Sequence, residues 1–107
     1  MFKMSKKKIL IADDEARITD LISDYLTAAG YETVVAGDGN AALEAFRQNK
    51  GLSAVILDIM MPGPDGWQVC KEIRKTSAVP VLMLTARAEE FDQLMGFVSG
   101  ADDYVTK

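Results

Sequence analysis

The sequence contains no histidine and one cysteine, Cys70. A single cysteine cannot form an internal disulfide, and without a cluster of cysteines and histidines the common zinc sites are excluded. Any reaction that needs an imidazole must therefore take it from another molecule. We expect Cys70 to be a small core residue rather than a reactive thiol, and this cysteine usage fits a reducing cytoplasm.

The sequence also lacks long apolar runs and an excess of positive charge. No run approaches the roughly 20 residues of a membrane-spanning helix, so we expect neither a membrane anchor nor a signal peptide. The 12 basic and 16 acidic residues give a net charge of -4. This balance argues against nucleic-acid binding by this segment. The 107 residues, 49% of them hydrophobic, suit one globular domain.

Short apolar runs alternate with segments of helical periodicity along the whole chain. We predict strands at 8–12, 32–36, 54–58 and 80–84 and within 101–107, and helices from 16 to the Gly30 cap and at 41–48, 67–75 and 88–99. The apolar face of the first helix is expected to contain Ile18, Leu21, Ile22, Tyr25 and Leu26. Such alternation with short connections predicts an α/β fold, a doubly wound parallel sheet with helices on both faces.

The stretch from Leu52 to Gly66 is the most informative part of the sequence. Its apolar run delivers one carboxylate, Asp58, at the carboxyl end of a strand buried on both faces. Two prolines and two glycines follow within eight residues, which forces a loop before the next helix. Asp58 is therefore held by a strand at the sheet edge where open α/β folds bind ligands.

Other polar residues end the neighbouring strands. Asp13 and Asp14 follow the first strand, Thr85 ends the fourth, and Lys107 follows the fifth. Each has a plain alternative: the aspartates or Thr85 could cap helices, and Lys107 could be a solvated residue. Together at one edge, three carboxylates require a cation, and oxygen ligands without imidazole or thiolate suit Mg²⁺ or Mn²⁺. The hydroxyl and the ammonium could bind the oxygens of a phosphoryl group.

Four motifs resemble the receiver domains of two-component response regulators, and nearly the whole chain takes part. They are Asp13-Asp14, Asp58-x-x-Met61-Pro62-x-x-Asp65-Gly66, Thr85-Ala86, and Gly100-Ala101-Asp102-Asp103-Tyr104-Val105-x-Lys107. The resemblance implies a flavodoxin-like sheet of order 2-1-3-4-5. The segment from Phe97 to Tyr104 looks most like regulators that carry a winged-helix DNA-binding domain, so the implied output is transcription.

The resemblance also implies the roles of individual residues. Asp58 would accept a phosphoryl group from the phosphohistidine of a sensor kinase. Mg²⁺ would be held, directly or through water, by Asp13, Asp14, Asp58 and the backbone carbonyl of Met60. Thr85 and Lys107 would contact the phosphoryl oxygens. Thr85 and Tyr104 would form the conformational switch, although Tyr104 could equally be a half-buried strand aromatic. Such a domain assists only its own phosphorylation and dephosphorylation and is not otherwise an enzyme.

Two other functions compete with this interpretation. A phosphatase with an aspartyl nucleophile needs a second acid two residues later to protonate the leaving group, and Met60 occupies that position. A receiver-like binding module that is never phosphorylated usually lacks part of the site, whereas all the expected side chains are present. Nucleotide binding is disfavoured because neither glycine-rich phosphate motif occurs.

The resemblance departs from the family pattern at the chain end. The family continues past the lysine with a proline and a fifth helix, and here the sequence stops at Lys107. We therefore expect residues 1–107 to be a receiver domain that is incomplete at its C-terminus. Part of an apolar sheet face would be uncovered, which predicts self-association or reduced stability.

Overall fold

The computed structural model describes residues 6–86 and 100–107. Their five strands form one parallel sheet in the order β2-β1-β3-β4-β5. The strands are β1 (Lys8–Ala12), β2 (Glu32–Ala36), β3 (Ala54–Asp58), β4 (Val81–Thr85) and β5 (Asp103–Thr106). The predicted strand order is confirmed. Every carboxyl end therefore lies at the same edge of the sheet.

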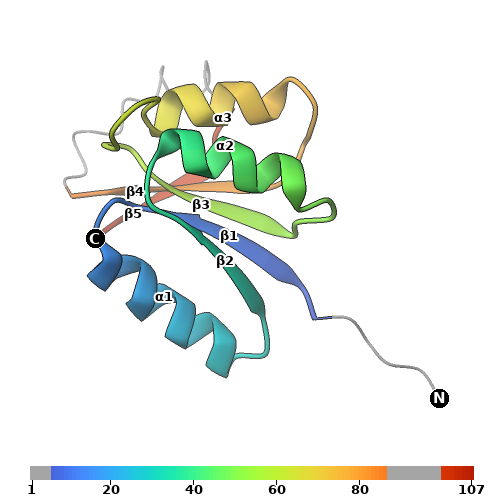
Figure 1. The fold of residues 1–107 in the computed structure, drawn as a ribbon, viewed down its shortest axis with the longest axis vertical. Coiled ribbons are helices and arrows are strands. Elements are labelled where there is room, and N and C mark those ends of the chain that lie inside the picture. Colours follow the sequence, from blue (N-terminus) through green and yellow to red (C-terminus); the bar gives the residue numbers. More distant parts are fainter. Residues whose placement is uncertain (1–5, 87–99) are drawn as a thin grey trace.

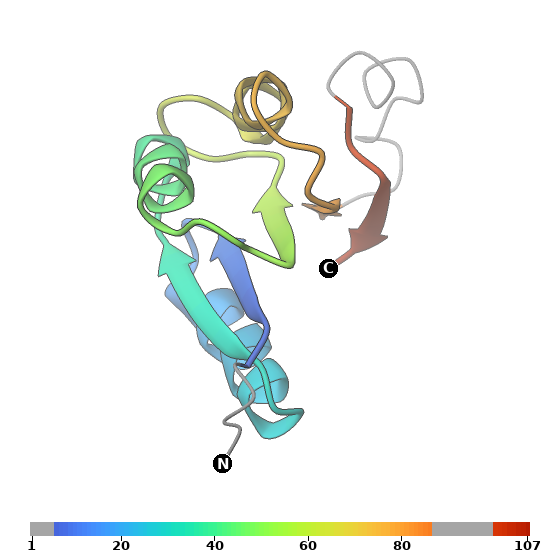
Figure 2. The same cartoon turned by 90° about the vertical axis from the view of Figure 1, so that its right-hand side faces the viewer.

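Helices cover both faces of this sheet. Helix α1 (Ala16–Ala28) lies on one face, and α2 (Gly39–Gln48) and α3 (Gly66–Arg74) lie together on the other (Figure 1). The view from the side separates the two layers of helices clearly (Figure 2). The doubly wound fold is thus confirmed, while the helix predicted at 88–99 lies outside the described residues.

Local signals explain where the helices begin and end. Gly30, at a φ of 97°, follows α1 in the left-handed conformation that favours glycine. The side chain of Asp38 accepts a hydrogen bond from the backbone N–H of Ala41 (2.7 Å) and caps α2. Asp65 and Gln68 form a reciprocal capping box at the start of α3. These caps start α2 and α3 one or two residues earlier than the apolar pattern predicts.

The core lies between the sheet and the layer of α2 and α3. Its centre is formed by fully buried residues from the strands and from α3, among them Leu10, Val55, Leu57, Val69, Cys70, Ile73 and Met83. Cys70 is a buried core residue, as predicted. This packing makes β1 and β3 the rigid centre of the domain.

The α1 face is packed less completely than the sequence predicts. Ile18, Ile22 and Leu26 are partly buried, but Leu21 and Tyr25 are 56% and 75% exposed. The five apolar residues lie on one helical stripe but are not all buried, because α1 packs mainly on β1 and β2 and leaves Leu21 and Tyr25 exposed. In the part of the chain that the structure describes, no helix is both long and apolar enough to cross a bilayer.

Candidate functional site

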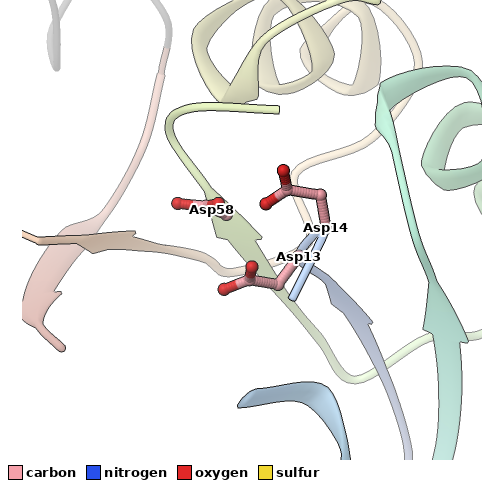
Figure 3. A group of neighbouring side chains, drawn as sticks. All are labelled: Asp13, Asp14 and Asp58. Atoms are coloured by element: carbon pink, nitrogen blue, oxygen red, sulfur yellow. The ribbon is translucent and has the colours of Figure 1, made fainter. Parts of the chain in front are cut away.

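Three carboxylates gather where β1 and β3 end. Asp13 and Asp14 follow β1, Asp58 is the last residue of β3, and their side chains approach one another above the strand ends (Figure 3). One carboxylate oxygen from each residue lies within 4.8 Å of the other two. Asp13 and Asp58 are only 1% and 4% exposed, whereas Asp14 is exposed. The convergence predicted from the strand ends is therefore present.

The backbone fixes the two buried carboxylates. The N–H of Asp13 donates to the carbonyl of Ala36 in β2 (3.1 Å), and its Oδ1 accepts from the N–H of Glu15 (2.9 Å). After Asp58, the N–H of Ile59 donates to the carbonyl of Leu84 in β4 (3.1 Å). The backbone at both carboxylates is thus tied to a neighbouring strand, and Oδ1 of Asp13 is also held by the backbone N–H of Glu15.

Gly66 lets the loop after β3 fold tightly over Asp58. Its N–H donates to the carbonyl of Ile59 (2.8 Å). A β-carbon at this position would collide with the backbone carbonyl of Asp58 and lie 2.9 Å from Cε of Met83. Only glycine fits here. In the Asp65-Gly66 pair, Asp65 therefore caps α3 and Gly66 allows the loop to approach the backbone of Asp58 closely.

Lys107 connects the two buried carboxylates. Its Nζ lies 2.9 Å from Oδ2 of Asp13, 3.2 Å from Oδ1 of Asp58 and 3.5 Å from Oε1 of Glu15, and its side chain is 16% exposed. Its backbone N–H donates to the carbonyl of Thr85 (2.7 Å), which extends the β4–β5 pairing. The sequence predicted Lys107 at this edge. It did not predict the contact with Glu15, because the only sequence feature that pointed to Glu15 was its position directly after Asp13 and Asp14.

Burial makes Asp58 an unusually weak acid. Desolvation, reinforced by the charge of Asp13, raises the pKa of Asp58 from 3.8 to about 6, although Lys107 and the backbone N–H of Met60 act against this rise. At neutral pH the carboxylate is still mostly ionised. Asp58 therefore combines a desolvated, basic oxygen with the charge that a nucleophile needs.

The pKa of Lys107 moves in the direction that keeps its charge. Burial by itself would lower this pKa, but the hydrogen bonds and charges of Asp13 and Asp58 outweigh burial and raise it. Lys107 thus stays a cation beside two carboxylates throughout the physiological range.

The chemistry of the site fits a hard divalent cation. Oδ2 of Asp13 is buried, and its contact within the described residues is the ammonium of Lys107 at 2.9 Å, so the oxygen keeps a lone pair that a cation could use. The other available ligands are carboxylate oxygens, the set that Mg²⁺ and Mn²⁺ prefer. Three carboxylates and one ammonium also leave the site with an excess of negative charge.

The remaining predicted residues lie around this centre. Thr85 ends β4, is 1% exposed, and holds Lys107 through its backbone carbonyl. Tyr104 lies in the edge strand β5 and is 37% exposed. The Met60 side chain is 67% exposed in the loop directly after Asp58. The structure brings Asp13, Asp14, Asp58 and Lys107 together and leaves the functional roles of Thr85, Tyr104 and the Met60 carbonyl as predictions.

Fold and site define a flavodoxin-like α/β domain with an aspartate and lysine centre at the carboxyl edge of its sheet. Residues 9–107 match the response regulator receiver domain model. The chain therefore belongs to the response regulator receiver domain family. The resemblance seen in the sequence is confirmed.

Relatives and solved structures agree with this assignment. The chain is 50% identical over 102 residues to "Probable transcriptional regulator ycf27" of Pyropia yezoensis, covering 95% of this chain and 42% of that protein. It is 46% identical over 99 residues to the sensory transduction protein RegX3 of Mycolicibacterium smegmatis, covering 92% and 43%. The chain thus spans less than half the length of these relatives.

Two solved structures illustrate the likeness in three dimensions. The response regulator TrrA of Thermotoga maritima, in complex with Mg²⁺-BeF, superposes with a TM-score of 0.86 at 39% identity, covering 94% of this chain and 86% of that one. The BeF₃-activated receiver domain of Klebsiella pneumoniae RstA gives 0.86 at 32% identity, with the same coverage.

Proposed function

We propose that Asp58 is the phosphoacceptor of a two-component signalling system. A carboxylate oxygen of Asp58 attacks the phosphorus of a phosphohistidine on a partner sensor kinase, the N–P bond breaks, and the imidazole keeps the electron pair and takes up a proton. The observation that carries this proposal is the buried Asp58 carboxylate, with Lys107 3.2 Å away and two further aspartates beside it. These 107 residues contain no histidine, so the phosphohistidine lies outside them, and we assign it to the partner kinase.

The cation in this proposal is Mg²⁺, or Mn²⁺ in its place. Asp13, Asp14, Asp58 and the carbonyl of Met60 would hold it, and the three converging carboxylates favour such a ligand set. When bound, the cation neutralises charge on the phosphoryl oxygens. Lys107 binds another of these oxygens through its ammonium, and the hydroxyl of Thr85 donates to a third.

The same site returns the phosphoryl group to water, and this is the only other reaction that we propose for it. Thr85 and Tyr104 respond to the phosphoryl group as the conformational switch. They pass its state to an output, for which the named relatives favour transcription. We propose a cytoplasmic location and no direct binding of nucleic acid by this segment, in accord with its net charge of -4.

The proposal is tested with acetyl phosphate, a small phosphodonor, and Mg²⁺. Intact mass should rise by one phosphoryl group, and peptide mapping should place it on Asp58. Asp58→Asn should remove the label while circular dichroism stays unchanged, because the amide is nearly isosteric with the carboxylate. Asp65→Asn is the matched control, since this nearby loop aspartate lies outside the carboxylate cluster. Undiminished labelling of Asp58→Asn would refute the assignment.

A further inference from the structure

Arg74, at the end of α3, binds two other parts of the chain at once. Its Nε donates to the carbonyl of Gly100 (2.8 Å), and its Nη1 donates to the carbonyl of Val79 (2.6 Å). Its Nη2 donates to Oδ2 of Asp102 (2.9 Å), and the side chain is 22% exposed. One guanidinium therefore joins α3 to the segment before β4 and to the segment before β5.

Asp102 completes this connection from the other side. The same Oδ2 accepts the N–H of Val81, the first residue of β4 (2.7 Å), and the N–H of Asp102 donates to the carbonyl of Val81 (2.9 Å). Charge-assisted hydrogen bonds of this kind are roughly twice as strong as neutral ones. These hydrogen bonds of Asp102 fix the register in which β5 pairs with β4.

Gly100 has no side chain and so leaves room for the side chain of Arg74. Its φ of 85° lies in the left-handed region, and an added β-carbon would lie 2.7 Å from Cγ of Arg74. The stem of Arg74 therefore passes directly over this residue. Gly100, Arg74 and Asp102 together form a unit that we call the β5 anchor.

The strand that follows lies at the edge of the described sheet. All four residues of β5 are exposed, and within the described residues its pairing is with β4 alone. Lys107 comes directly after this strand. A slip of one residue moves it about 3.3 Å along the sheet, which would break its contacts with Asp13 and Asp58.

We propose that Arg74 is a positioning residue for Lys107, acting from the opposite end of β5 by fixing the strand's register. The proposal concerns the same site as the proposed function and rests on it only for the consequence in phosphoryl transfer. Loss of the β5 anchor should release Lys107 from the carboxylates. Phosphoryl transfer should then weaken, and Mg²⁺ binding should become tighter, because an ammonium that competes for Asp13 and Asp58 has moved away.

The test compares Arg74→Gln with Lys75→Gln, which changes the neighbouring residue and removes only a surface ion pair with Glu72. In Arg74→Gln we expect backbone amides of residues 104–107 to exchange about tenfold faster, while amides of β1 stay unchanged. Labelling by acetyl phosphate should slow about tenfold and the Kd for Mg²⁺ should fall. Lys75→Gln should match the parent in all three measurements.

A double variant separates positioning from general support of the fold. If Arg74 acts through Lys107, adding Arg74→Gln to Lys107→Met should change neither labelling nor Mg²⁺ affinity further. Additive losses would overturn the proposal, as would unchanged exchange in 104–107 or a uniform rise that includes β1. If the parent takes no label at all, the proposed function fails, and the exchange and Mg²⁺ measurements still decide the role of Arg74.

Discussion

The ammonium of Lys107 lies 2.9 Å from Oδ2 of Asp13, the buried oxygen that otherwise makes no hydrogen bond within the described residues. The lysine ammonium therefore already neutralises part of the negative charge that would bind a metal ion. This relationship has opposite consequences for the two ligands of the proposed site. The ammonium of Lys107 should weaken binding of the cation and strengthen binding of the phosphoryl group.

We accordingly expect Lys107→Met to tighten Mg²⁺ binding while slowing labelling of Asp58. Removing a like charge a few ångströms from the cation should improve affinity about tenfold, allowing for partial screening by solvent. Isothermal titration with MgCl₂ measures the first effect and intact mass after acetyl phosphate the second. Weaker Mg²⁺ binding in this variant would show that Lys107 orders the carboxylates rather than competing for them.

The raised pKa of Asp58 predicts how stability depends on pH. Its folded pKa of about 6 exceeds the ordinary 3.8, so the folded protein holds the proton more tightly than the unfolded chain. This destabilisation is absent below pH 3.8 and complete above about pH 6, where it reaches on the order of 3 kcal/mol. The free energy of unfolding should therefore fall as pH rises through this window.

Asp58→Asn provides the control for that pH dependence. Urea denaturation of the variant at several pH values, without metal, should show a much shallower fall and greater stability than the parent at pH 7. Parallel curves for the two proteins would mean that Asp58 does not titrate in this range.

Mg²⁺ should raise the melting temperature of the parent, because it relieves repulsion among the three carboxylates. At a hundredfold excess over Kd the gain is about 2.7 kcal/mol. Asp13→Ala should lose most of this response. Asp24→Ala removes an exposed acid of α1 and should keep the rise in melting temperature with Mg²⁺. The comparison distinguishes binding at a specific site from a general effect of negative charge. Equal responses of the two variants would remove Asp13 from the metal site.

Gly66→Ala should damage the site through packing alone. The new β-carbon meets the carbonyl of Asp58 and Cε of Met83, and overpacking of this kind costs about 1–3 kcal/mol. Labelling of Asp58 should fall as well, because the end of β3 must shift. Gly37→Ala is the control, since a β-carbon there meets nothing within 4 Å. Urea midpoints that agree for the two variants would contradict the close approach at Gly66.

Self-association remains a proposal, and the exposed Leu21, Tyr25 and Val105 support it. Val105 pairs with Leu84 and so lies on one face of the sheet with it. Sedimentation should show association that grows with concentration and decreases in Tyr25→Ser. Gln48→Ser, at an exposed position of α2, should leave it unchanged. A parent that stays monomeric at high concentration would exclude this proposal.

The sequence by itself determined the alternation of strands and helices and the acids at the ends of β1 and β3. These features are local, since a period of two or 3.6 residues and a Pro-Gly loop after Asp58 act within a few residues of the chain. The strand order came from motif resemblance, whereas the place of Lys107 followed from its position after the fifth strand. Parallel pairing then required Asp13 and Asp58 to meet at one edge.

Only the tertiary structure decided which groups the site buries and which it pairs. Asp13 and Asp14 are adjacent and identical in type, and both reach toward Asp58 (Figure 3), yet Asp13 is 1% exposed and Asp14 is exposed. Likewise the apolar pattern cannot tell that Leu21 and Tyr25 stay exposed, or that Arg74 reaches Gly100 and Asp102. Such contacts join residues far apart in sequence, and their geometry depends on how the sheet and helices pack rather than on any local pattern.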